Sequence, residues 1–174
     1  MTTTDLLAKK ILGLSHLTGE FTLRSGNISH QYFDKYQFES DPTILREICK
    51  NLVPLLPQAE FLAGIEMGGI PIATVLSQMT LQPTLFVRKE AKQYGTAKLA
   101  EGPEFAGRHI LLVEDIVTSG GQIVLSANKL RELGAIVTHA VCVIDREAGG
   151  AENLAKDGIE LIALYRESDL KGSE

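Results

Sequence analysis

The stretch Leu111–Gly121, LLVEDIVTSGG, decides how the rest of the chain is interpreted. It begins with the apolar run of a buried strand and continues into two adjacent carboxylates, Glu114 and Asp115. Hydroxyl residues and two glycines follow, and then a helical pattern begins. The backbone N–H groups and hydroxyls of such a turn can bind an anion at the start of the next helix. Because carboxylates repel phosphate, we expect the two acids to bind neutral hydroxyls, or a metal ion, beside it. A sugar phosphate satisfies both demands.

The size and composition of the chain favour a single domain over residues 1–174. Hydrophobic residues make up 44% of the sequence and charged residues 22%, which are ordinary globular values. The net charge of −5 disfavours a nucleic-acid partner, because nucleic-acid-binding surfaces are usually basic. No apolar run approaches the ~18 residues of a membrane span, and the N-terminus has no signal-peptide core. We therefore expect a cytoplasmic protein without a membrane partner. Cys49 and Cys142 lie in apolar surroundings and are expected to be buried thiols.

Short apolar strands alternate with helical patterns along most of the chain, which predicts a mainly parallel sheet covered by helices on both faces. The expected strands are 61–65, 84–87, 109–113, 140–144 and 160–164. The expected helices are 4–18, 41 to about 56, 70–79, 122–133 and about 150–157. Residues 19–38 are expected to form short strands around a Ser25-Gly26 turn. The polar stretch 88–107 is too long for an ordinary connection, and such loops tend to be functional.

Glu114 and Asp115, taken by themselves, are explained most simply as solvated acids that cap the following helix. Their position at a strand end and the continuation into Thr118–Gly121 favour a binding site instead. The stretch is not a P-loop, since no Gly-Lys-Ser/Thr follows. It is not a dinucleotide fingerprint either, since G-x-G-x-x-G is absent. It resembles the phosphoribosyl-pyrophosphate (PRPP) signature of the type I phosphoribosyltransferases.

This resemblance implies a fold and a first set of ligand contacts. The fold is the α/β type I phosphoribosyltransferase fold, with a central, mainly parallel sheet flanked by helices. A small N-terminal hood would come from about residues 1–40. The acidic pair would hold the 2- and 3-hydroxyls of the ribose, and the loop would hold the 5-phosphate. The PRPP-binding residues implied here are Glu114, Asp115, Ile116, Val117, Thr118, Ser119, Gly120, Gly121 and Gln122.

Residues 88–102, RKEAKQYGTAKLAEG, carry a surplus of positive charge in an acidic protein. A solvated surface explains such a segment, and so does a mobile loop that brings cations onto a charged leaving group and excludes water. The segment resembles the catalytic loop of orotate phosphoribosyltransferases, Arg-Lys-Glu-x-Lys-x-x-Gly. The resemblance implies that Arg88, Lys89 and Lys92 bind PRPP and act in catalysis. It also implies a homodimer, in which the loop reaches the neighbouring subunit's site. Tyr94 stands where family members often have a histidine.

The segment Glu66-Met67-Gly68-Gly69 follows an expected strand and precedes an expected helix. A simple turn explains it, since glycine permits backbone angles that other residues avoid. The resemblance instead makes it the loop that binds pyrophosphate, with Met67 and Gly68 as PRPP-binding residues. Some orotate enzymes have a lysine at the position of Gly68. Its absence here shifts the cationic role to Arg88, Lys89 and Lys92, or to Mg²⁺.

Two further segments are candidates for binding a base. Residues 21–26, FTLRSG, with Tyr32-Phe33-Asp34-Lys35, are consistent with an exposed hairpin. Residues 145–147 are consistent with a surface salt-bridge cluster. In the orotate enzymes that they resemble, the first segment forms a hood over the base, and the arginine of Asp-Arg-Glu addresses the pyrimidine. An arginine replaces the usual hood lysine and keeps its charge. The orotate-binding residues implied are Arg24, Tyr32, Phe33, Thr118 and Arg146.

From residue 20 to about 164 the chain resembles the orotate phosphoribosyltransferases. The implied reaction transfers the 5-phosphoribosyl group from PRPP to N1 of orotate, giving orotidine 5′-monophosphate and pyrophosphate in UMP biosynthesis. Lys89, Lys92 and Arg88 would neutralise the leaving group, together with Mg²⁺ held mainly by PRPP and water. Asp115 and Glu114 would fix the sugar, and proton transfer is a weaker alternative role for Asp115. A non-catalytic PRPP sensor that binds nucleic acid is the alternative function, which the acidic charge and the loop cations disfavour.

Overall fold

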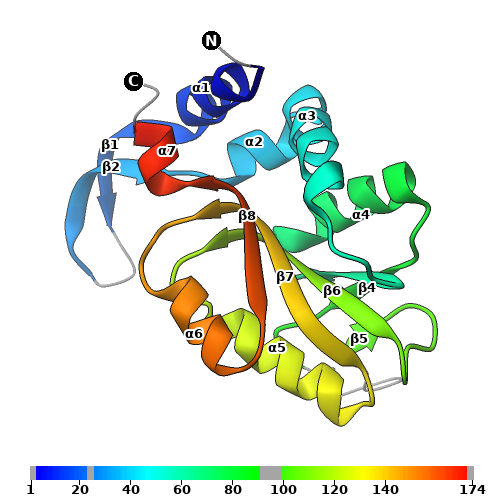
Figure 1. Cartoon of the computed structure of the whole chain (residues 1–174). Coiled ribbons are helices and arrows are strands. Elements are labelled where there is room, and N and C mark those ends of the chain that lie inside the picture. Colours follow the sequence, from blue (N-terminus) through cyan, green and yellow to red (C-terminus); the bar gives the residue numbers. More distant parts are fainter. Residues whose placement is uncertain (1–2, 23–25, 91–98, 172–174) are drawn as a thin grey trace.

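A six-stranded sheet forms the centre of the molecule, with the strand order β5-β4-β3-β6-β7-β8 (Figure 1). The computed structural model describes residues 3–22, 26–90 and 99–171. Neighbouring strands run parallel except for β4 and β5, which pair antiparallel. The mainly parallel α/β sheet predicted from the sequence is confirmed. The strands are β3 (Phe61–Ile65), β4 (Thr84–Val87), β5 (Ala100–Glu101), β6 (His109–Val117), β7 (Ile136–Asp145) and β8 (Glu160–Arg166).

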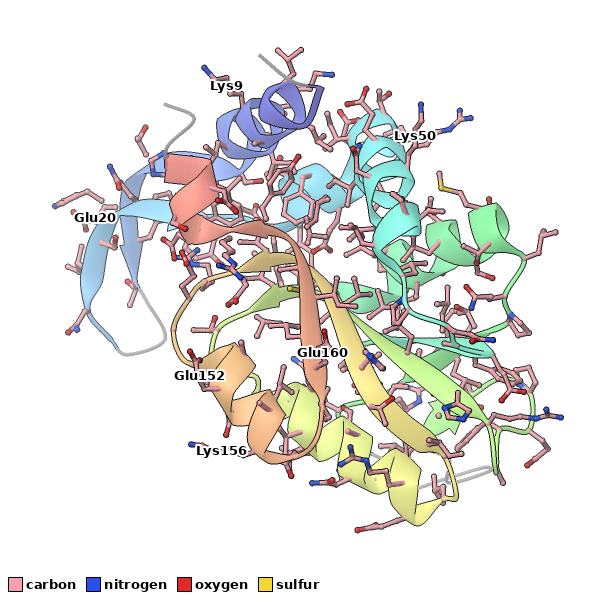
Figure 2. All side chains as sticks on the ribbon, viewed as in Figure 1. Lys9, Glu20, Lys50, Glu152, Lys156 and Glu160 are labelled. Atoms are coloured by element: carbon pink, nitrogen blue, oxygen red, sulfur yellow. The ribbon has the colours of Figure 1, made fainter. Side chains whose placement is uncertain are left out.

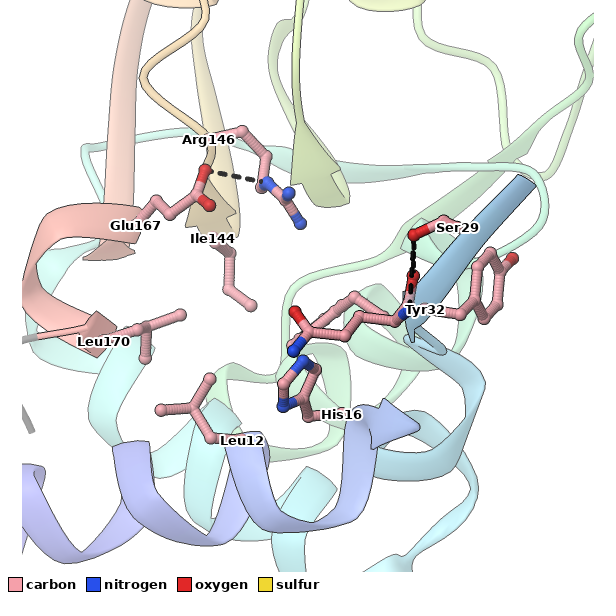
Figure 3. Close-up of a pocket in the computed structure, with 10 residues that line it drawn as sticks. Leu12, His16, Ser29, Tyr32, Ile144, Arg146, Glu167 and Leu170 are labelled. Carbon is pink, nitrogen blue, oxygen red and sulfur yellow. Dashed lines mark hydrogen bonds and ion pairs between the residues drawn. The ribbon is translucent and has the colours of Figure 1, made fainter. Parts of the chain in front are cut away.

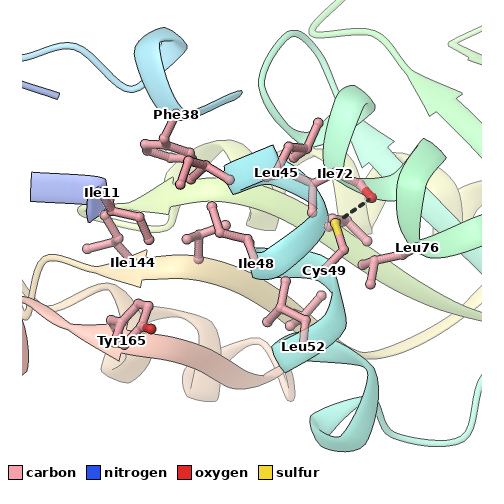
Figure 4. Close-up of a cluster of buried hydrophobic side chains, with 14 of the residues drawn as sticks. Ile11, Phe38, Leu45, Ile48, Cys49, Leu52, Ile72, Leu76, Ile144 and Tyr165 are labelled. Atoms are coloured by element: carbon pink, nitrogen blue, oxygen red, sulfur yellow. Dashed lines mark hydrogen bonds between the residues drawn. The ribbon is translucent and has the colours of Figure 1, made fainter. Parts of the chain in front are cut away.

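Helices cover both faces of this sheet because side chains alternate along each strand. On β6, Leu111 packs into the core under α3 and α4, whereas Ile110 and Leu112 pack into the core under α5 and α6. Figure 4 shows the first of these cores, in which Ile48 and Leu52 of α3 lie over the sheet. Charged side chains such as Lys50 point outward (Figure 2). The covering helices are α3 (Pro42–Leu52), α4 (Gly69–Thr80), α5 (Gly121–Glu132) and α6 (Gly150–Lys156).

Local chemistry sets the ends of these helices. Asp41 caps α3, because its Oδ1 accepts hydrogen bonds from the backbone N–H groups of Thr43 at 2.9 Å and Ile44 at 3.0 Å. Pro42 occupies the first turn, where a missing N–H has no consequence. A 3-10 turn, η1 (Val53–Leu55), follows α3. No helix in the described ranges has the length and apolarity of a membrane span.

The N-terminal part forms a separate two-stranded antiparallel sheet beside the main sheet (Figure 1). It consists of β1 (His16–Thr22) and β2 (Ile28–Phe33), with α1 (Thr3–Ser15) before it and α2 (Tyr36–Ser40) after it. We refer to β1 and β2 as the hood. The prediction that the first helix reaches residue 18 is wrong, because His16–Thr18 pair with β2 instead. The predicted strand character up to residue 38 is also wrong, since Phe38 belongs to α2 and is fully buried.

Several other boundaries differ from those predicted. Strand β6 extends to Val117, so that Glu114 and Asp115 lie within the strand rather than after it. Part of the polar stretch 88–107 belongs to the sheet, since Leu99 and Ala100 are buried and β5 pairs with β4. A short helix that was not predicted, α7 (Glu167–Lys171), follows β8. Both cysteines are buried free thiols, as predicted; burial raises the pKa of Cys49 to about 12 and raises that of Cys142 well above its usual range.

Candidate functional site

The strand order changes direction between β3 and β6, and this change locates the site. From β3 the chain proceeds outward to β4, whereas from β6 it proceeds the other way to β7 and β8. In open α/β sheets, ligands bind beyond the carboxyl ends of the strands at such a point. The segments that leave these two strand ends are the turn at residues 66–68 and the loop at residues 118–120. Both were predicted from the sequence to bind PRPP.

The Thr118–Gly121 loop and the end of β6 border a cavity of about 190 Å³, which we call the loop cavity. Gly120 permits the sharp entry into α5, since its φ of 72° is one that glycine adopts readily. Asn153 of α6 supports the loop by donating a hydrogen bond from Nδ2 to the carbonyl of Ser119 at 2.9 Å. The first turn of α5 offers backbone N–H groups without helical partners, which suit an anion. The lining residues are Glu114, Ile116, Val117, Thr118, Ser119, Gly120, Gly121, Gln122 and Ile123.

The two acids of β6 face opposite sides of the sheet. Glu114, predicted to bind PRPP, lines the loop cavity. Asp115 does not line it, and only 1% of this residue is exposed. The binding of both acids to one ribose stays a prediction, but it was made with the strand ending at residue 113, before both acids. In a strand, successive side chains point in opposite directions.

Asp115 instead forms an ion pair with Lys35, a residue of the predicted hood segment to which the sequence analysis gave no role. Its Oδ2 lies 2.5 Å from Nζ of Lys35, and its Oδ1 accepts a hydrogen bond from the N–H of Ile116 at 2.5 Å. Burial alone would raise the pKa of Asp115, but the hydrogen bond and charge of Lys35, together with hydrogen bonds to Glu114 and Glu39, outweigh it and lower the pKa. Burial and the neighbouring Asp115 charge raise the pKa of Glu114 well above its usual range.

Glu39 of α2 completes this cluster and was also not predicted. It is 7% exposed. Burial, followed by a hydrogen bond with Asp115 and the charge of Asp115, raises the pKa of Glu39 to about 8. At neutral pH Glu39 is therefore mainly protonated and neutral. No motif assigns this contact to Lys35, which lies in the predicted hood segment, or to Glu39, because it depends on α2 folding back against the end of β6.

The turn after β3 passes close to the same carboxylate. A Cβ atom at Gly68 would lie 1.5 Å from Oδ2 of Asp115, and one at Gly69 would lie 2.1 Å from the carbonyl oxygen of Val113. Only glycine fits either position. In this arrangement a side chain is excluded at Gly68, a position where some orotate enzymes have a lysine. Met67, predicted with Gly68 to bind PRPP, is 60% exposed and follows a cis peptide bond after Glu66.

The basic segment after β4 begins beside this turn. Oε1 of Glu66 accepts a hydrogen bond from the backbone N–H of Lys89 at 2.7 Å. The guanidinium of Arg88 lies 3.8 Å from the carboxylate of Glu101. Arg88 and Lys89 thus stand at the carboxyl edge of the sheet, next to the turn. The predicted residues Lys92 and Tyr94 lie outside the described residues.

A second and larger cavity, of about 590 Å³, lies between the hood and the main sheet; we call it the hood cavity (Figure 3). The predicted residues Tyr32, Phe33 and Arg146 line it, whereas Thr118 does not, and Arg24 lies outside the described residues. Arg146 donates from Nε to the carboxylate of Glu167 at 3.0 Å, and its guanidinium lies 5.9 Å from the ring centroid of Phe33. The remaining lining residues are Leu12, His16, Ser29, Gln31, Ile144, Glu167 and Leu170.

The sequence analysis missed the contributions of α1 and α7 to the hood cavity. Figure 3 shows Arg146 with Glu167 on one side of the cavity and Leu12 with His16 on the opposite side. His16 was not assigned a role, and Glu167 belongs to a helix that was not predicted. Neither residue is part of a recognisable motif.

A strand-order switch with a phosphate-type loop on one strand and an arginine-lined cavity beside the next is the arrangement of a phosphoribosyltransferase. The sequence matches the phosphoribosyl transferase domain family over residues 36–165. An orotate phosphoribosyltransferase of Nocardioides sp. is 47% identical over 171 residues, covering 98% of this chain and 96% of that protein. The chain belongs to the orotate phosphoribosyltransferase family.

Solved structures agree with this assignment. The orotate phosphoribosyltransferase of Mycobacterium tuberculosis in complex with Fe(III) dicitrate has a TM-score of 0.83 at 27% identity, covering 96% of this chain and 98% of that one. Leishmania donovani UMP synthase also has a TM-score of 0.83, at 26% identity over 99% of this chain. The match spans 38% of the UMP synthase chain, so only part of that protein is comparable. These similarities confirm the predicted type I phosphoribosyltransferase fold.

Proposed function

We infer that the protein transfers the 5-phosphoribosyl group of PRPP to N1 of orotate, giving orotidine 5′-monophosphate and pyrophosphate. One structural observation carries this assignment beyond family membership. The backbone N–H of Arg146 donates to the carbonyl of Val117 at 2.9 Å. Val117 borders the loop cavity and Arg146 borders the hood cavity, so a sugar phosphate and a base held in these cavities would be neighbours.

The chemistry required of the protein is electrostatic rather than nucleophilic. Orotate brings its own nucleophilic nitrogen, so the protein has to stabilise positive charge on the ribose and negative charge on the departing diphosphate. Glu114 is placed to accept hydrogen bonds from ribose hydroxyls, and the N–H groups of the Thr118–Gly121 loop to bind the 5-phosphate. Arg146 would orient the base. Asp115 is ionised and ion-paired, which suits a hydrogen-bond acceptor better than a proton donor.

The leaving group would be bound by the basic segment after β4. Arg88 and Lys89 lie beside the turn at residues 66–68, and we propose that Lys92 joins them on the diphosphate. Such cations act most strongly where water is excluded. Lys92→Ala is expected to lower turnover far more than the PRPP affinity, because charge on the diphosphate grows as the bond breaks.

We also propose Mg²⁺ as a cofactor, held mainly by PRPP and water. In the described ranges, no group of three or more His, Cys, Asp or Glu side chains could hold a metal ion. Mg²⁺ commonly uses substrate phosphates and water with few protein ligands, which fits this arrangement. When bound, the ion would neutralise charge on the diphosphate. Chelation with EDTA should abolish turnover, and added Mg²⁺ should restore it; turnover that survives chelation would contradict the proposal.

Two further properties are proposed from the family resemblance and the composition. We propose a homodimer in which residues 88–102 of one subunit reach the site of the other, and a cytoplasmic location. Light scattering should give twice the 18.9 kDa mass of the chain. Mixing a Lys92→Ala variant with an Arg146→Ala variant should restore activity, because a shared site allows each subunit to supply what its partner lacks. A monomer, or no restoration, would refute the shared loop.

The assay that tests the main inference is direct. Purified protein with Mg²⁺, PRPP and orotate should consume orotate, as measured by its ultraviolet absorbance. Adenine or hypoxanthine in place of orotate should give no turnover. Turnover of a purine alone would refute the substrate while keeping the reaction class. PRPP binding without turnover of any base, combined with a nucleic-acid mobility shift, would favour the non-catalytic sensor.

A further inference from the structure

Lys35 is held in a contact that the proposed reaction does not explain. Its Nζ lies 2.5 Å from Oδ2 of Asp115, and its side chain is 32% exposed while that of Asp115 is 1% exposed. Burial alone would lower the pKa of Lys35, but the contact with Asp115 and the charges of Asp115 and Glu114 raise it. Lys35 is therefore charged, and its partly exposed side chain contacts the buried carboxylate of Asp115.

Among the described residues, Lys35 is the only cation found in contact with Asp115, and the other ionisable groups beside Asp115 are the carboxyl groups of Glu39 and Glu114. Glu39 is neutral near pH 7, because its pKa is raised to about 8, and so adds no full charge. Glu114 faces the loop cavity on the opposite side of β6. Lys35 and Asp115 thus neutralise each other in a pair, and a ribose hydroxyl could reach Oδ2 only after Nζ moves away.

The surroundings of Lys35 determine where a displaced amine would go. Gly68 packs against the same oxygen that Lys35 contacts, since a Cβ atom there would lie 1.5 Å from Oδ2 of Asp115. The turn containing Gly68 leads into α4, and Glu66 of that turn accepts the N–H of Lys89. Lys35 therefore lies at the junction between the β6 acids, which are proposed to hold the sugar, and the turn and cations proposed to hold the diphosphate.

We propose that Lys35 changes partners when PRPP binds: ribose hydroxyls take its place on Asp115, and its amine moves onto the diphosphate. This inference rests on the proposed function. The exchange keeps an anion beside Lys35 and a hydrogen-bond donor beside the buried Asp115 throughout, so neither group is left unpaired. It also gives the diphosphate a cation that comes from the residue before α2 and not from residues 88–102.

The reverse reaction separates this role from a structural one. With orotidine 5′-monophosphate and pyrophosphate as substrates, Lys35→Met should raise the KM for pyrophosphate about 10- to 100-fold, the range of one lost charged hydrogen bond. The forward KM for orotate should stay within about twofold of the wild-type value, since Lys35 does not line the hood cavity. Lys50→Met, which removes an exposed lysine of α3, is the matched control and should change neither KM.

A second pair of variants covers the case in which Lys35→Met fails to fold because Asp115 is left unpaired. Asp115→Asn removes the anion, and Lys35→Met in that background leaves no buried charge. The double variant should have a pyrophosphate KM about tenfold or more above that of Asp115→Asn alone. Equal pyrophosphate KM values would show that Lys35 only supports Asp115 and would overturn the proposal. The forward assay with orotate is run first on the wild-type protein. Inactivity in that assay would instead refute the proposed function.

Discussion

The loop cavity and the hood cavity are built from the chain in different ways. Ten consecutive residues, 114–123, contain every residue that lines the loop cavity. The hood cavity takes its lining from α1, the hood, β7 and its end, and α7, which extend from Leu12 to Leu170. In a cavity lined by one segment, local turns and the start of one helix fix the geometry. A cavity made by distant segments exists only when the whole fold has assembled, and its shape depends on how those segments pack.

The largest effect is expected at Gly68, in the turn that packs against the Asp115 carboxylate. Gly68→Ala leaves the backbone unstrained, because the φ of −69° suits any residue, but its Cβ would overlap the Asp115 carboxylate. We expect kcat/KM to fall at least about a hundredfold, since the β6 acids and the turn must shift. Gly13→Ala is the control, as a Cβ atom there has no neighbour within 4 Å and should leave activity unchanged. Wild-type kinetics in Gly68→Ala would show that the turn tolerates displacement.

Arg146→Ala tests whether the two cavities bind separate parts of the reaction. Loss of the guanidinium should raise the KM for orotate about 10- to 100-fold, because hydrogen bonds to charged groups contribute about 1.5–3 kcal/mol. The KM for PRPP should change little. Arg46→Ala, at an exposed position of α3, should match the wild type. An equal rise in both KM values would mean that the cavities act as one unit.

Asn153→Ala should have a smaller effect, confined to PRPP. The change removes the 2.9 Å hydrogen bond to the carbonyl of Ser119 and loosens the loop without removing any lining residue. A neutral hydrogen bond contributes about 0.5–1.5 kcal/mol, so the KM for PRPP should rise about 2- to 10-fold. Asn51→Ala removes a comparable bond, to the carbonyl of Glu47, far from both cavities. A change in the orotate KM instead would contradict the division between the cavities.

The smallest effect concerns the dependence of stability on pH. The pKa of Glu39 is raised to about 8 in the folded state, so the folded protein holds this proton more tightly than the unfolded chain does. Stability from this group is present at low pH and is lost as pH rises from the ordinary carboxyl range to about 8. Glu39→Gln cannot lose the proton, so its melting temperature should exceed that of the wild type by a few degrees at pH 9, since about 1 kcal/mol corresponds to about 2–4 °C.

Thermal unfolding between pH 5 and pH 9 measures this difference, with Glu104→Gln at an exposed position as the control. The two curves for Glu39→Gln and wild type should converge towards pH 5. Parallel curves at all pH values would show that Glu39 stays ionised, and the charge balance around Lys35 would then have to be reconsidered.

The contrast between the cavities also explains how much could be predicted from the sequence. Strands β3 and β4 were predicted with their observed bounds, because short apolar runs between turns have few alternative structures. The residues of the loop cavity follow one another along the chain, so the motif identified them directly. The end of β6 was placed too early, because the charged pair Glu114 and Asp115 was interpreted as the start of a loop.

What could not be predicted depends on contacts between distant segments. Residues 36–38 were predicted to be part of a strand region that is rich in aromatic residues. They belong instead to α2, which places Glu39 beside Asp115. The five-residue helix α7 has too few residues to show a helical period, and it brings Glu167 to Arg146. Both are decided by packing rather than by local preference.

The burial of both cysteines makes the protein suitable for site-specific labelling. Cys49 and Cys142 are fully buried, and burial raises the pKa of each thiol, so reagents that attack thiolates should leave the native protein unmodified. The sequence contains no other cysteine. A single cysteine introduced at exposed His30 of the hood would therefore carry the only reactive thiol, and a fluorophore attached there could follow in real time how the hood responds to each substrate.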